Sequence, residues 1–175
     1  MKITPSRPRL SPVEAMIAQP SEWLPSPIAV GELASALAGA PLFAGIEESE
    51  IAGALTAFDE VRYPSGRRVL IEGLRGSDFF LVVAGTAAVI VDGRRVAMLG
   101  PGDFFGEMAI LGAGLRTASV RAETPMHCLV LPNAKLEGLL LDHPQLGINV
   151  LHALVSRFAE LDAWSAAFPT EAGGT

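Results

Sequence analysis

The chain has 175 residues, which is enough for one domain with a sizeable core and little more. Half of its residues are apolar and its mean hydropathy is +0.39, so the composition excludes a disordered chain. The net charge of −6 argues against a nucleic-acid-binding surface, which is normally basic. A single cysteine excludes a disulfide framework and a four-cysteine cluster.

The first residues, Met1 to Pro5, lead into no apolar segment of the kind that a secretory signal peptide contains. The longest apolar run, residues 79–91, contains Gly85 and is too short to cross a bilayer as a helix. We therefore expect a cytoplasmic protein with no membrane span, and Cys128 as a small buried hydrophobe.

Residues 1–28 hold six of the thirteen prolines, and this composition predicts a flexible N-terminal arm. Within the arm, Trp23 and Leu24 form an apolar island, which leaves open that the arm docks on the domain or on a partner. We expect the folded domain over residues 29–165 and a disordered tail over residues 166–175.

Helical patterns come first in the predicted domain. Residues 30–38 fit a short helix with Gly39 just beyond its end. Residues 41–46 fit a turn, and residues 47–58 fit a second helix because their apolar positions recur at nearly helical spacing.

From residue 58 onward the pattern changes to short strands separated by turns. Asp92-Gly93 is the strongest hairpin signal, because Asp-Gly suits a type I′ turn. The expected strands are 61–63, 69–71, 79–84, 86–91, 96–99, 104–106, 118–122 and 126–131. Eight short strands predict a mainly β fold, a jelly-roll-like antiparallel barrel with flanking helices.

Two helices are predicted after the strands. Asn133 is placed to cap a helix over residues 134–141, and Pro144 suits the first turn of the last helix. An apolar seam with 3-4-3 spacing is then expected on the last helix, formed by Leu151, Leu154, Phe158 and Leu161.

The segment 106–118 interrupts the strands and places an acid and a base, Glu107 and Arg116, in apolar surroundings. A buried carboxylate or guanidinium is costly unless it is paired or meets a ligand. The guanidinium fork matches two phosphate oxygens, a carboxylate accepts from a sugar hydroxyl, and the start of a short helix offers N–H groups to an anion. These residue types predict a site for a small anionic ligand that carries hydroxyl groups.

Gly106-Glu107-Met108-Ala109-Ile110, followed by Arg116-Thr117-Ala118, resembles the phosphate-binding cassette of the cyclic nucleotide-binding domain family. The resemblance covers roughly residues 35–164 and implies an eight-stranded β-roll with N-terminal helices and C-terminal lid helices. It also implies that Glu107 holds the ribose 2′-hydroxyl and Arg116 the cyclic phosphate. The backbone would complete the cradle at Gly106, Met108, Ala109 and Ala118.

The sequence departs from the family pattern at two positions. Leu115 stands where many relatives carry proline, and Leu74 stands where relatives often carry an acid after Glu72-Gly73. Neither change removes a group that the resemblance assigns to the ligand.

The identity of the nucleotide is less sharply indicated. In some relatives a threonine at the position of Thr117 favours guanine, but its hydroxyl can equally reach the phosphate. The overall composition favours cyclic AMP, with cyclic GMP or a cyclic dinucleotide as alternatives. In relatives the last helix closes over the base and often pairs two subunits. The lid candidates are therefore Phe158, Leu161 and Trp164, with core packing or a homodimer seam as the alternative role for the first two.

Three other functions compete with a ligand sensor. A metal-dependent barrel enzyme needs clustered histidines and a carboxylate, whereas His127, His143 and His152 are scattered. We expect no metal, no cofactor and no catalytic residue. A transcription factor needs a DNA-binding domain after the last helix, and the roughly ten residues after Trp164 are too few for a helix-turn-helix. A module that keeps the fold without a ligand is the remaining alternative. The favoured interpretation is a stand-alone cyclic nucleotide receptor that signals to an unidentified protein partner.

Overall fold

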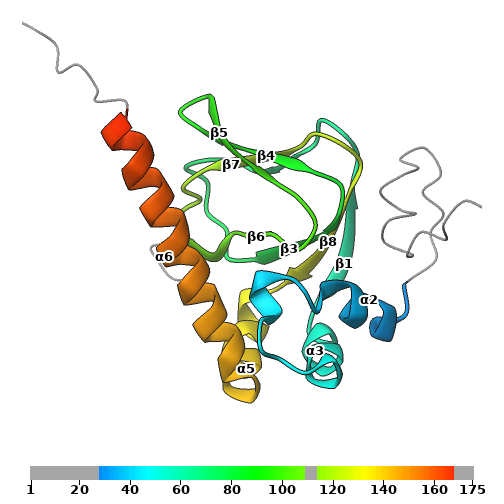
Figure 1. The fold of residues 1–175 in the computed structure, drawn as a ribbon. Coiled ribbons are helices and arrows are strands. Elements are labelled where there is room, and N and C mark those ends of the chain that lie inside the picture. The colour runs from blue at the N-terminus through cyan, green and yellow to red at the C-terminus, as the bar shows by residue number, and fades with distance from the viewer. Residues whose placement is uncertain (1–27, 109–113, 168–175) are drawn as a thin grey trace, which may run out of the picture.

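The structure, a computed structural model, describes residues 28–108 and 114–167. Two antiparallel sheets face each other, α2, α3 and α5 lie below one sheet, and α6 runs along the side of the barrel (Figure 1). This arrangement confirms the predicted β-roll with flanking helices. The predicted arm, apart from residue 28, and residues 168–175 of the predicted tail lie outside the described residues.

Each sheet joins strands that are distant in the sequence. The first sheet has the order β1-β8-β3-β6 and the second has the order β2-β7-β4-β5. In the first sheet, Asp59 lies opposite Val130. The strands are β1 (Asp59–Tyr63), β2 (Arg68–Leu70), β3 (Phe79–Ala84), β4 (Ala87–Val91), β5 (Arg94–Leu99), β6 (Phe104–Phe105), β7 (Ser119–Ala122) and β8 (Met126–Leu131).

Strand β3 lies in the middle of the core and is buried on both faces. Phe79 and Leu81 pack towards the helices, whereas Phe80 and Val82 pack between the two sheets. The alternation follows from the period of two in a strand, and it explains why this strand is apolar throughout. Cys128, on β8, is fully buried, as predicted, and burial raises the pKa of its thiol to about 12.

Two turns depend on left-handed backbone. Asp92 and Gly93 have φ of 50° and 74°, which confirms the predicted hairpin between β4 and β5. Gly85 has φ of 84°, and a Cβ there would lie 2.2 Å from the carbonyl oxygen of Pro125. Only glycine fits this reversal between β3 and β4.

The helices are α2 (Val30–Leu37), η1 (Pro41–Phe43), α3 (Glu48–Leu55), α5 (Asn133–Asp142) and α6 (Pro144–Ala167). Pro144 begins α6, as predicted. The predicted cap at Asn133 is wrong, because Pro132 occupies the N-cap position and no side chain caps α5. No helix within the described ranges is both long enough and apolar enough to cross a membrane.

Helix α6 packs on η1 and the barrel with one face only. Leu146 and Leu154 are buried, whereas Ile148, Leu151 and Val155 are 44%, 59% and 68% exposed. Leu151 and Leu154, two members of the predicted apolar seam, therefore differ in their surroundings, because Leu154 is buried and Leu151 is exposed. The side chains of Phe158 and Leu161 lie outside what the structure describes.

Candidate functional site

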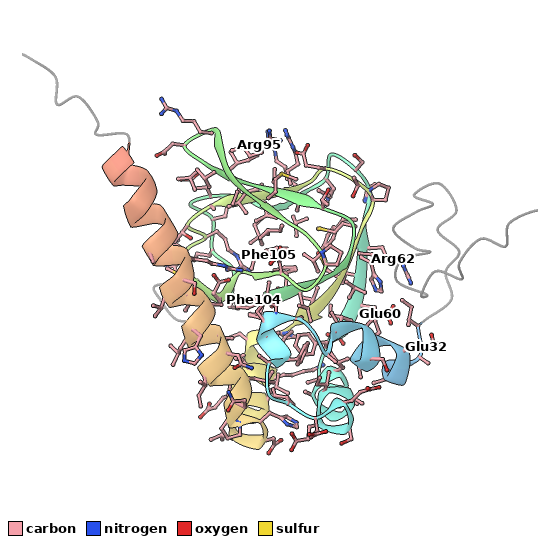
Figure 2. The ribbon with its side chains drawn as sticks, in the orientation of Figure 1. Glu32, Glu60, Arg62, Arg95, Phe104 and Phe105 are labelled. Atoms are coloured by element: carbon pink, nitrogen blue, oxygen red, sulfur yellow. The ribbon has the colours of Figure 1, made fainter. Side chains whose placement is uncertain are left out.

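The candidate site begins where β6 ends. Figure 2 shows Phe104 and Phe105 on β6, beside α6. Gly106 follows with φ of 91°, and a Cβ there would lie 2.5 Å from the carbonyl oxygen of Asp78. The backbone turns helical at Glu107 and Met108, so glycine at 106 lets the chain leave the strand and enter the turn that carries Glu107.

Glu107 is 5% exposed and pairs with a residue of α6. Its Oε1 accepts a hydrogen bond from Nη1 of Arg157 at 2.8 Å. Arg157 also donates from Nη2 to the carbonyl oxygen of Phe104, and its guanidinium lies 4.6 Å from the centroid of the Phe104 ring. The second carboxylate oxygen of Glu107, Oε2, is buried and accepts no hydrogen bond from the described residues.

Arg116 is 6% exposed and is held by backbone carbonyls. Its Nη1 donates to the carbonyl oxygens of Asp78 and Gly106 at 3.0 and 3.2 Å, and the guanidinium lies 5.8 Å from the Phe80 ring centroid. Within the described part of the chain, Nε and Nη2 donate to no acceptor. Burial lowers the pKa of Arg116, and the negative charges of Asp78 and Glu107 oppose that shift.

Two glycines enclose this guanidinium. A Cβ at Gly76 would lie 2.7 Å from Nε of Arg116, and a Cβ at Gly106 would lie 3.0 Å from its Nη1. The first distance is shorter than real Cβ contacts and the second is tighter than most of them, so the guanidinium occupies space that side chains at these positions would need. Gly76 is not among the predicted site residues, because nothing in its local sequence marks it as a neighbour of Arg116.

The predicted site residues fall into three groups. Glu107 and Arg116 are buried; Gly106, Met108 and Ala118 are half-buried, and Thr117 is exposed. Ala109 lies outside the described residues. The lid candidates Phe158, Leu161 and Trp164 belong to α6, but their side chains are not described.

Glu107 forms no ion pair with Arg116 in the described part of the chain. Among the described residues its ion-pair partner is Arg157, fifty positions later in the sequence. Sequence analysis missed Arg157. The available signal was a basic residue between the apolar residues Leu154 and Phe158 of a helix otherwise expected to pack on the barrel.

The arrangement combines unused donors with an unused acceptor. Nε and Nη2 of Arg116 form the edge of a planar fork, which suits two oxygens of one phosphate. Oε2 of Glu107 suits a hydroxyl. The described residues contain no group of three or more His, Cys, Asp or Glu side chains placed to hold a metal ion.

Two surface hollows lie away from Glu107 and Arg116. One hollow of about 360 Å³ borders α5, lined by Leu136 and Leu140 among others, and another of about 190 Å³ lies between Pro41 and Pro101. Neither includes Glu107 or Arg116. The site is therefore identified by its polar groups and not by the size of a cavity.

Comparisons with known proteins concern the domain as a whole. The family model for the cyclic nucleotide-binding domain matches residues 60–143. The chain is 30% identical over 126 residues to a CRP-like cAMP-activated global transcriptional regulator of Mycobacterium tuberculosis; the alignment covers 69% of this chain and 56% of that protein.

Two solved structures are similar. The catabolite activator protein of Thermus thermophilus gives a TM-score of 0.69 at 31% identity, covering 73% of this chain and 62% of that one. A cyclic nucleotide-binding domain from Methylobacillus flagellatus gives a TM-score of 0.65 at 25% identity, and the match covers 83% of this chain and 85% of that one. The chain thus spans little more than half of the regulator and all but a small part of the isolated domain. It belongs to the cyclic nucleotide-binding domain family.

Proposed function

We propose that this chain is a cyclic nucleotide receptor module, with cyclic AMP as the favoured ligand and without catalytic activity of its own. One observation carries the proposal. Oε2 of Glu107 is buried and accepts no hydrogen bond from the described residues, and the nearby buried Arg116 has N–H groups that donate to none of them. Buried polar atoms are almost always satisfied in folded proteins, so an incomplete set is best explained by a ligand that completes it. The name of the M. tuberculosis relative supports cyclic AMP.

The roles of the individual groups follow from their chemistry. Nε and Nη2 of Arg116 would donate to the cyclic phosphate, and a ribose hydroxyl would donate to Oε2 of Glu107. The backbone at Gly106, Met108, Ala109 and Ala118 would complete the cradle. Thr117 is exposed, so its hydroxyl is available to the phosphate or to the base.

Arg157 gives the proposed receptor a route for its signal. A hydroxyl on Oε2 leaves the bond between Oε1 and Arg157 in place. The bound nucleotide would therefore fix the position of Glu107 and, through Arg157, that of α6. Ligand would favour this closed arrangement over a more open one that already exists in the ensemble.

The exposed face of α6 supports a homodimer. Ile148, Leu151 and Val155 form an apolar row at helical spacing on the side of α6 that faces away from the barrel. We infer that a second copy covers this row, and that Phe158, Leu161 and Trp164 extend either the seam or a lid over the base. Light scattering with and without nucleotide tests the dimer, and a monomer in both states would contradict it. A cytoplasmic location and a domain over residues 29–165 belong to the same proposal.

A thermal-shift screen of cyclic AMP, cyclic GMP and cyclic dinucleotides tests the function. At a hundredfold excess over Kd, the correct ligand adds about 2.7 kcal/mol to the free energy of unfolding, which is roughly 5–10 °C in Tm for a chain of this size. Adenosine 5′-monophosphate is the matched control because it lacks the cyclic phosphodiester. If no cyclic nucleotide raises Tm, the chain is a module that keeps the fold without the ligand.

A further inference from the structure

Three aliphatic side chains near the candidate site are exposed to solvent. Ile71, Leu74 and Leu115 are 42%, 54% and 45% exposed, and we call them the aliphatic trio. The amide of Leu74 donates to the carbonyl oxygen of Ile71 at 3.2 Å, and Leu115 forms an isolated β-bridge with Arg75. The trio thus lies on two neighbouring segments, and its exposure indicates a surface that another molecule covers.

The backbone around the trio is already paired within the chain. The amide of Arg116 donates to the carbonyl oxygen of Leu74 at 2.9 Å, and the amide of Gly73 donates to the carbonyl oxygen of Arg116 at 2.8 Å. The amide of Gly76 donates to the carbonyl oxygen of Gly114 at 3.1 Å. These bonds use the edge that an added strand would need, so a partner contacts this surface through side chains, as one face of a helix does.

Three exposed arginines lie around the trio, together with two acids, Glu72 and Asp92. Arg75 is exposed beside Leu115, and Arg94 and Arg95 are exposed on the hairpin between β4 and β5. The turn of this hairpin lies against the trio's loop, because the amide of Asp92 donates to Oε2 of Glu72 at 3.1 Å. None of these three arginines forms an ion pair with a described residue.

The N-terminal helices, at the opposite end of the molecule, carry a net negative charge. Residues 28–58 contain four glutamates and no lysine or arginine. Figure 2 shows Glu32 beside α2, and Glu60 of β1 beside Arg62, with which it forms an ion pair, whereas Arg95 lies on the far side of the barrel. An acidic partner is therefore repelled from the helical end and attracted to the end that carries the trio.

We propose that the aliphatic trio, with Arg75 and Arg94 beside it, is the docking surface for an amphipathic acidic helix of another protein. Apolar residues of that helix cover the trio and its carboxylates pair with the arginines. A second copy of this chain is a poorer fit, because its acidic helix α3 uses Ile51 and Leu55 in its own core.

The surface is linked to Arg116, which under the proposed function binds the phosphate. The backbone N–H and C=O of Arg116 are hydrogen-bonded to Leu74 and Gly73, in the segment that carries two members of the trio. A ligand that fixes Arg116 therefore changes the affinity for the helix, and the helix changes the affinity for the ligand by the same factor.

Fluorescence anisotropy of the full chain with two labelled 18-residue peptides tests the docking. Both peptides carry leucine at helical spacing; one has glutamate at the other positions, and the other has lysine. In the absence of nucleotide, we expect the glutamate peptide to bind at least tenfold more tightly. Leu74→Ser and Leu115→Ser should each weaken it at least fivefold, and Arg75→Glu should remove the preference. Leu141→Ser, at a leucine of α5 that is 73% exposed, is the matched control and should change nothing.

Several results would overturn the docking surface. These are equal binding of both peptides, equal weakening by Leu141→Ser, self-association of the chain that Leu74→Ser abolishes, and binding to anionic phosphatidylserine vesicles without binding of the peptide. Because these measurements use no nucleotide, the docking is decided independently of the proposed function. Saturating cyclic AMP should then change the affinity for the peptide at least threefold, and an unchanged affinity would overturn the link to Arg116.

Discussion

Helix α6 is held at two buried polar contacts that differ in one respect. At the first, Asn149 is 5% exposed, and its Nδ2 donates to the carbonyl oxygens of Leu42 and Ala44 at 2.8 and 2.9 Å. Its Oδ1 accepts from Nε2 of Gln145 at 3.1 Å. The chain itself supplies a partner for every polar atom of this amide, so the contact stabilises the fold and offers nothing to a ligand.

The second contact, between Arg157 and Glu107, is incomplete. Oε1 of Glu107 is paired, whereas Oε2 is buried and accepts no hydrogen bond from the described residues. Arg116 nearby has donors that no described residue uses. The two contacts therefore have different roles. A buried group whose hydrogen bonds are all made within the chain holds two elements together, whereas a buried group that lacks a hydrogen-bond partner marks a place where a ligand can supply it.

Replacing Arg116 should give the largest effect. Arg116→Ala removes two charge-assisted hydrogen bonds to the phosphate, so the affinity for the nucleotide should fall by about 3–6 kcal/mol, on the order of 10²- to 10⁴-fold. Isothermal titration calorimetry measures it. Arg121→Ala is the matched control, since Arg121 is exposed on β7 and pairs with Glu123. Equal affinities for wild type and Arg116→Ala would refute the assignment.

Asn149→Leu should affect stability instead of binding. Leucine has the branched shape of asparagine, although it is larger, and it leaves the carbonyl oxygens of Leu42 and Ala44 without their donor. The free energy of unfolding should fall by about 2–4 kcal/mol, measured by urea denaturation. We expect the affinity for the nucleotide to stay within about threefold of wild type, because α6 keeps its second contact. A large loss of affinity for the nucleotide with an unchanged free energy of unfolding would contradict the purely structural role of Asn149.

Arg157→Ala should affect both properties moderately. It leaves the carboxylate of Glu107 buried without its cation, but Arg157 is 34% exposed and solvent weakens the pair. Stability should fall by about 1–2 kcal/mol, and the affinity for the nucleotide by about 3- to 30-fold, because Glu107 loses the group that positions it. Arg157→Lys should recover part of both losses. Calorimetry showing tighter binding by Arg157→Ala would mean that Arg157 competes with the ligand.

The smallest effect concerns pH. His127 is buried on β8 with Nε2 3.3 Å from Oε2 of Glu60, and burial lowers the pKa of His127 although Glu60 opposes the shift. In the unfolded chain His127 binds a proton near pH 6.5, whereas in the folded chain it does so only at lower pH. The free energy of unfolding should therefore fall as pH drops below about 6.5. The slope from this group is at most about 1.4 kcal/mol per pH unit. Thermal unfolding of His127→Gln between pH 7.5 and 5.0 should show a shallower decline than wild type. His152→Gln, at an exposed histidine of α6, should decline as wild type does.

The parts that sequence predicted were those that local pattern determines. Alternating apolar residues gave the strands, and Asp92-Gly93 gave the hairpin, because a type I′ turn needs left-handed backbone. Glu107 and Arg116 stood out because charges in apolar surroundings need partners.

The remaining features depend on contacts between distant segments. Gly76 is required by the guanidinium of Arg116, forty residues later in the sequence, and Arg157 reaches Glu107 across fifty. The exposure of Leu151 beside the buried Leu154 depends on how α6 rotates against η1. Helical periodicity alone does not specify that rotation.

A crystal structure of the protein grown with saturating cyclic AMP tests the central claim most directly. We predict that two oxygens of the cyclic phosphate lie within hydrogen-bond distance of Nε and Nη2 of Arg116. A ribose hydroxyl should lie against Oε2 of Glu107, while Oε1 still accepts from Arg157. A nucleotide bound elsewhere on the chain, or an empty site at saturating concentration with Oε2 still unpartnered, would contradict it.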